Sequence, residues 1–130
     1  MSRVMLALKV TVEEAASGTA GRKKKTALPR TLVFDEIDIG IGGRAAEAVG
    51  RKLKTLSKGQ QVLCITHLPQ IASLGYRHFS IVKDTRADPT RAEVVQLDEG
   101  DVVAELVRML GADSDDIAAR RHARDLRRAA

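Results

Sequence analysis

Two neighbouring carboxylates follow a short apolar segment and could bind a metal ion and activate water. The segment runs from Thr31 to Phe34, and Asp35 and Glu36 come directly after it. One carboxylate could hold Mg²⁺, directly or through its waters, because Mg²⁺ takes oxygen ligands and keeps much of its hydration. The other could orient and deprotonate an attacking water. The alternative is that both are ordinary solvated residues at the start of a loop.

A hydroxyl and an imidazole, those of Thr66 and His67, come at the end of a second apolar segment, residues 61–66. The first segment, an apolar strand that delivers Asp35 and Glu36, has the layout of a Walker B segment in nucleoside-triphosphatases. Parallel neighbouring strands end at the same edge of a sheet, so we expect His67 to lie near the acidic pair, within reach of a terminal phosphate. A lone histidine after a strand can instead be purely structural.

The elements that must position these residues are indicated by apolar periodicity and by glycine and proline. Residues 31–34 and 61–66 each predict a buried strand, and a glycine-rich link at 40–43 leads into the helix between them, which Gly59 ends. The apolar face of this helix consists of Ala46, Val49, Leu53 and Leu56. A short helix is expected to start at Pro69. The alternation of strand and helix predicts an α/β fold with a parallel sheet.

The flanking regions predict one further helix before this sheet, and a hairpin and two helices after it. Residues 3–15 have the spacing of an amphipathic helix, and 17–30 have the composition of a flexible loop. Residues 78–83 and 92–97 predict a hairpin. The next helix carries an apolar stripe from Val102 to Leu110 and is closed by Gly111; Ser114 is expected to cap a final helix that runs to Ala130.

Composition limits the classes of protein to which the chain can belong. Its 130 residues, 44% of them hydrophobic, suffice for one modest core, so we expect a single soluble domain or part of a larger one. The apolar runs are too short for a membrane span. Cys64 is the only cysteine, which excludes an intrachain disulfide and fits a reducing cytosol. The net charge of +5 favours contact with the phosphates of a nucleotide or a nucleic acid.

Four strings resemble the bacterial RecN DNA repair proteins, relatives of the structural-maintenance-of-chromosomes and ABC-type ATPases. They are Ser-Arg-Val-Met-Leu-Ala-Leu-Lys at residues 2–9, Leu-Val-Phe-Asp-Glu-Ile-Asp at 32–38, Gly-Ile-Gly-Gly-Arg-Ala-Ala at 40–46, and Thr-His-Leu-Pro-Gln-Ile-Ala at 66–72. The C-terminal string Val-Arg-Met-Leu-Gly at residues 107–111 is also similar to the family. Residues 17–30 look like an enlarged loop. The resemblance implies that residues 1–130 form the C-terminal lobe of a P-loop ATPase head: a parallel sheet with flanking helices, a C-terminal hairpin and helices.

For the acidic strand and the histidine, the resemblance implies specific roles. Asp35 would coordinate Mg²⁺, Glu36 would be the catalytic base, and His67 would contact the γ-phosphate of ATP.

For the residues around these, the resemblance implies contacts between two heads. Asp38 and the following glycines, Gly40 and Gly42 among them, would form the D-loop, which in the family communicates between two heads that sandwich ATP. Ser2 and Arg3 would be the remnant of the signature motif, whose helix N-terminus faces the partner's γ-phosphate.

The phosphate loop of such a head, Gly-x-x-x-x-Gly-Lys-Ser/Thr, does not occur in the sequence. We therefore expect ATP and Mg²⁺ to bind only in a complete head, with the N-terminal head lobe or a second head as partner, and ATPase activity of the chain alone to be negligible. By the resemblance, the full protein would contact DNA in double-strand break repair and recombination, in the bacterial cytoplasm at the nucleoid, with no membrane.

Two other functions stay open. The chain could be a non-catalytic DNA- or protein-binding module from a truncated gene, with the basic run Lys23 to Lys25 on DNA. It could also be a small metal-dependent nuclease that uses Asp35, Glu36 and Asp38. That alternative is disfavoured because such enzymes gather carboxylates from several strands, and no second acidic cluster follows a strand here.

Overall fold

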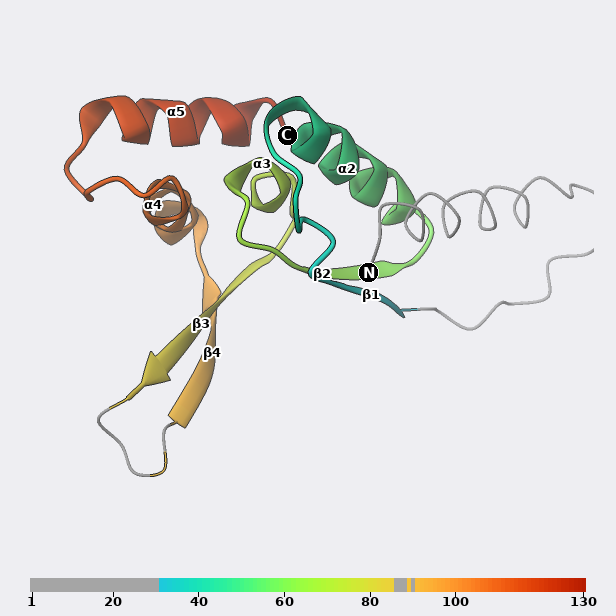
Figure 1. The fold of residues 1–130 in the computed structure, drawn as a ribbon, viewed down its shortest axis with the longest axis horizontal. Helices are drawn as coiled ribbons and strands as arrows, with labels where there is room; N and C mark the ends of the chain where they lie inside the picture. Colours follow the sequence, from blue (N-terminus) through green and yellow to red (C-terminus); the bar gives the residue numbers. More distant parts are fainter. Residues whose placement is uncertain (1–30, 86–88, 90) are drawn as a thin grey trace, which may run out of the picture. The chain divides into compact units, whose positions relative to one another are not determined.

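The computed structural model describes residues 31–85, 89 and 91–130, which form two compact units. The first unit ends at His67 and the second runs from Leu68 to Ala130. Figure 1 labels the helices and strands of both units. The expected helix over 3–15 and the expected loop over 17–30 lie outside the described residues. The α/β class is confirmed, whereas the single lobe over residues 1–130 stays a prediction. No helix in the described part of the chain is long and apolar enough to cross a membrane.

The first unit is a strand, a helix and a second strand parallel to the first. These are β1 (Thr31–Asp35), α2 (Gly43–Leu56) and β2 (Gln61–Ile65). Parallel strands need a crossover connection, and α2 supplies it. Val33 pairs with Leu63 and Asp35 with Ile65, so both strands end at one edge of the sheet. The predicted parallel pairing is confirmed.

The expectation that both strands are buried is wrong for one face of this sheet. Phe34 is only 2% exposed, and Ala46 and Leu53 of α2 are buried as well. On the opposite face, Val33 and Leu63 are 51% and 48% exposed. Strand side chains alternate between two faces, and continuous apolar runs such as these are usual where both faces are covered. Among the described residues the parallel sheet has two strands, and the face that carries Val33 is open.

The second unit combines a hairpin with three helices. Its elements are α3 (Pro69–Ala72), β3 (His78–Asp84), β4 (Arg91–Leu97), α4 (Glu99–Met109) and α5 (Ile117–Arg128). β3 and β4 pair antiparallel, which confirms the hairpin, and Pro69 opens α3 as expected. Val102, Leu106 and Val107 of α4 form a core cluster with Ala123 of α5.

The ends of the two long helices in this unit are set by carboxylate caps and a glycine. Asp98 caps α4 by accepting a hydrogen bond from the Asp101 amide at 3.0 Å, and Gly111, at φ 74°, follows the helix as predicted. The expected cap at Ser114 is wrong. The cap lies two residues later, at Asp116, whose carboxylate accepts from the Ala119 amide at 2.9 Å, and α5 begins at Ile117.

Candidate functional site

The acidic pair lies where the chain leaves the C-terminal end of β1. Asp35 is the last residue of the strand, and both Asp35 and Glu36 are exposed. Glu36 adopts a φ of 55°, a left-handed conformation that is uncommon for residues other than glycine. The backbone then turns, and the Ile39 amide donates to the Glu36 carbonyl at 3.5 Å. This turn leaves both carboxylates open to solvent at the edge of the sheet.

Asp38, two residues further on, has the opposite environment. Its side chain is 2% exposed, and its Oδ2 atom accepts hydrogen bonds from Thr66 Oγ1 at 2.5 Å and from the His67 amide at 2.9 Å. The same oxygen lies 3.1 Å from His67 Nδ1. Asp38 therefore links the turn after β1 to the end of β2.

The Asp38 carboxylate is held in its charged form by these contacts. Burial raises its pKa, because desolvation penalises the anion. The hydrogen bonds from Thr66 and from the His67 amide act in the other direction, and together with His67 they leave the pKa below its ordinary value of 3.8. The result is an ionised carboxylate inside the fold.

His67 combines a fixed ring nitrogen with an exposed ring. Its side chain is 72% exposed although Nδ1 lies against Asp38. The expectation that the histidine and the acidic residues lie at one sheet edge is met by the Asp35–Ile65 register. The contact that the structure shows is with Asp38, and sequence reasoning missed this contact and the part of Thr66 in it. The roles assigned to Asp35, Glu36 and His67 remain predictions.

The glycines after Asp38 set the course of the backbone into α2. Gly40 and Gly43 have φ values of 68° and 51°, which residues with a Cβ rarely adopt. Gly42 is extended and is the N-cap of α2. The structure gives Gly40 and Gly42 this conformational part and leaves their predicted nucleotide contact untested. Ser2 and Arg3 lie outside the described residues.

The donor set at this edge suits a metal ion that arrives with its own ligands. Within residues 31–85, 89 and 91–130, no group of three or more His, Cys, Asp or Glu side chains is placed to hold a metal. Mg²⁺ at nucleotide sites needs only one or two carboxylates, with phosphate oxygens and waters as its other ligands. The exposed Asp35 fits that requirement. A nuclease site that also used Asp38 does not fit, because the Asp38 carboxylate is buried and hydrogen-bonded.

The thiol of Cys64, on β2, is poorly reactive in this environment. Its pKa is raised to about 11 by burial and, to a smaller degree, by the negative charges of Asp38 and Asp35. A thiol reacts as its thiolate, so Cys64 is a poor nucleophile at neutral pH. We assign it no catalytic part.

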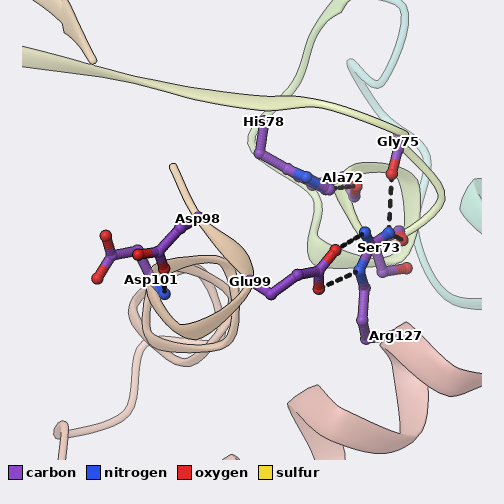
Figure 2. Close-up of polar contacts among 8 residues, drawn as sticks. All are labelled: Ala72, Ser73, Gly75, His78, Asp98, Glu99, Asp101 and Arg127. Atoms are coloured by element: carbon purple, nitrogen blue, oxygen red, sulfur yellow. Dashed lines mark hydrogen bonds and ion pairs between the residues drawn. The ribbon is translucent and has the colours of Figure 1, made fainter. Parts of the chain in front are cut away.

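The second unit contains a polar cluster that fastens its last helix (Figure 2). Arg127 of α5 donates through Nη1 to the carbonyl oxygens of Ser73 and Gly75, at 3.0 and 2.8 Å. Its Nη2 and Nε atoms donate to the Glu99 carboxylate at 2.8 and 3.4 Å, and the hydrogen bonds from Arg127 lower the pKa of Glu99. His78 Nε2 lies 2.8 Å from the Ala72 carbonyl oxygen. These contacts link α5 to α4 and to the segment that follows α3, and β3 to α3.

Comparison with known proteins gives one consistent result, although no family model matches the sequence. The chain is 42% identical over 126 residues to "DNA repair protein RecN" of Mycobacterium leprae, which covers 97% of this chain and 19% of that protein. It is 38% identical over 127 residues to the Bacillus subtilis protein of the same name, covering 97% and 20%. Identity to the Vibrio cholerae protein is 44% over 81 residues, covering 62% and 15%. The chain spans about a fifth of the length of the curated relatives it matches.

Proposed function

This chain is related to the RecN DNA repair proteins over nearly its whole length, and we propose that it is the C-terminal portion of a RecN-like ATPase head that acts in DNA double-strand break repair and recombination. The head would be of the ABC and SMC type, with a P-loop NTPase fold. One observation carries the proposal: a parallel strand pair whose two ends, the Asp35–Glu36 turn and Thr66–His67, are joined through Asp38.

In this proposal the exposed groups at the sheet edge divide the work of hydrolysis. Asp35 would hold the Mg²⁺ that enters with ATP, and the bound ion would supply neutralisation of phosphate charge. Glu36, exposed and one residue beyond the strand, accepts a proton from the attacking water. His67 presents its exposed ring to the γ-phosphate. Gly40 and Gly42 shape the loop that would meet a second head, where Ser2 and Arg3 would contribute the signature motif.

The proposed site is incomplete within this sequence, because the 130 residues contain no Gly-x-x-x-x-Gly-Lys-Ser/Thr loop. Phosphoryl transfer by P-loop enzymes depends on groups that position the triphosphate together. The proposed partner is therefore the N-terminal lobe of a head, and a second head completes the sandwich. The complete protein would work on DNA in the bacterial cytoplasm.

The test compares ATP hydrolysis by the chain alone with hydrolysis after fusion to the preceding part of the Mycobacterium leprae relative. We expect negligible turnover by the chain alone and Mg²⁺-dependent turnover by the fusion. Glu93→Gln, a substitution at an exposed position on β4, serves as the matched control for Glu36→Gln in the fusion. A fusion that binds no ATP would contradict the proposed head.

A second candidate function, direct DNA contact by the chain, is favoured by the arginines of α5. Arg121, Arg124 and Arg128 are exposed, and their spacing of three and four residues puts them on one face of the helix. Such a face attracts the DNA backbone. Replacing all three by Gln should weaken DNA binding. It should also reduce the slope of log binding constant against log salt by about 3, since each phosphate contact contributes roughly 0.9 to that slope. Neutralising Lys23, Lys24 and Lys25 is the parallel arm, and unchanged binding in both arms would exclude this function.

A further inference from the structure

Three polar atoms of Thr66 and His67 lie against one oxygen atom of Asp38. Oδ2 accepts from the Thr66 hydroxyl and from the His67 amide, and His67 Nδ1 lies 3.1 Å away from it. The donors come from residues 28 and 29 positions further along the chain. A single carboxylate oxygen thus contacts the backbone amide and the ring of His67 and the hydroxyl of the neighbouring Thr66.

The two partners differ in their access to solvent. The Asp38 side chain is 2% exposed, whereas the His67 side chain is 72% exposed. The Ile41 amide donates to the Asp38 carbonyl at 3.1 Å, which holds the Asp38 backbone in the turn. Asp38 is therefore turned inward, and the group that it presents outward is the imidazole of His67.

A hydrogen bond from Nδ1 to Asp38 would determine which ring nitrogen carries the proton. An ionised carboxylate can only accept hydrogen bonds, so Nδ1 of a neutral His67 must carry the hydrogen when it bonds to Asp38. Nε2, across the ring, then has the free lone pair. A carboxylate that orients a histidine through Nδ1 is a recurrent way of fixing the tautomer and orientation of a functional imidazole.

We propose that Asp38 is a positioning residue for His67, which it holds in the Nδ1–H tautomer with Nε2 available at the surface. This role lies within its own chain and is separate from the contact between two heads that the resemblance implies for the loop. The part that this plays in phosphate recognition rests on the proposed function. The geometry itself is independent of ATP.

The experiment is ¹⁵N NMR of the histidine rings in the full chain, without nucleotide, at a pH where the rings are neutral. We expect His67 to show the Nδ1–H pattern. His78 is an internal control of the opposite kind, because its Nε2 faces the Ala72 carbonyl and must carry the hydrogen. A His67→Gln variant assigns the His67 signals.

Two substitutions then test the cause. Asp38→Ala should move His67 towards the Nε2–H form and leave His78 unchanged, whereas Asp38→Asn, which keeps an oxygen acceptor, should preserve much of the Nδ1–H population. A wild-type His67 in the Nε2–H form overturns the proposal, as does an Asp38→Ala spectrum with an unaltered His67. If Asp38→Ala fails to fold, the wild-type and Asp38→Asn spectra decide. Failure of the ATPase proposal would leave these spectra unaffected.

Discussion

Arg127 offers a sharp test of what holds the second unit together. The Arg127 side chain is 21% exposed and gives two hydrogen bonds to backbone carbonyls and two to Glu99. Hydrogen bonds from a charged donor are worth about 1.5–3 kcal/mol each. The freed carbonyl oxygens of Ser73 and Gly75 regain some contact with water after truncation. We therefore expect Arg127→Ala to lower the free energy of unfolding by roughly 2–3 kcal/mol.

The structure predicts how this loss divides between the partners of Arg127. Glu99 is 78% exposed, so Glu99→Gln should cost only a small part of the loss, because exposed ion pairs contribute little. Arg127→Lys should recover part of it, since an ammonium group donates as a point charge without the planar fork. Arg128→Ala is the matched control: this neighbouring residue is exposed on the same helix, and its loss should change stability by less than about 0.5 kcal/mol.

The assay is urea denaturation followed by far-ultraviolet circular dichroism. Urea is preferred to guanidinium chloride because a salt would screen the Arg127–Glu99 pair. Equal losses for Arg127→Ala and Arg128→Ala would refute the reasoning. So would a loss for Glu99→Gln as large as that for Arg127→Ala, because the carbonyl contacts would then contribute nothing.

Three further predictions concern the charge and packing of the two units. Since the folded pKa of Asp38 lies below 3.8, its carboxylate stabilises the fold above that pH, and this contribution is lost as the pH falls through the folded pKa. Urea denaturation at a series of acidic pH values should show a steeper loss of stability below pH 3.8 for the wild type than for Asp38→Asn. With a pKa of about 11 instead of 9.0, Cys64 should react with iodoacetamide roughly 100-fold more slowly in the folded chain than in urea; equal rates would contradict its environment. Val107→Ala, at a side chain 1% exposed, should cost about 2 kcal/mol in urea denaturation, while Val94→Ala, at one 64% exposed, should cost far less.

Local pattern was sufficient to predict most elements of the fold. The spacing of Val102, Leu106 and Val107 defines one face of a helix, and their burial in α4 follows from it. Pro69 opens α3 because its fixed φ and missing amide hydrogen suit a first helical turn. The cap of α5 was less certain, since residues 113–116 are Asp, Ser, Asp and Asp, and all four can cap a helix.

Contacts between distant residues could not be predicted in this way. Residue types at 38 and 66 do not reveal that a carboxylate meets a hydroxyl across 28 positions, because this follows from strand register and loop course. Arg127 belongs to a charge-rich helix, and its partners are the backbone carbonyls of Ser73 and Gly75, more than 50 positions away. The exposure of Val33 likewise depends on what covers the sheet, which an apolar run does not specify.

The central claim, that this chain supplies the metal-binding and water-activating edge of an ATPase head, is tested most directly by Glu36→Gln in the fusion with the preceding part of the Mycobacterium leprae relative. Gln keeps the size of the side chain and removes the base. The account predicts that ATP binding persists while turnover falls by about 10²–10⁴-fold, and that Glu93→Gln changes neither. Turnover by Glu36→Gln at the wild-type rate would contradict the account.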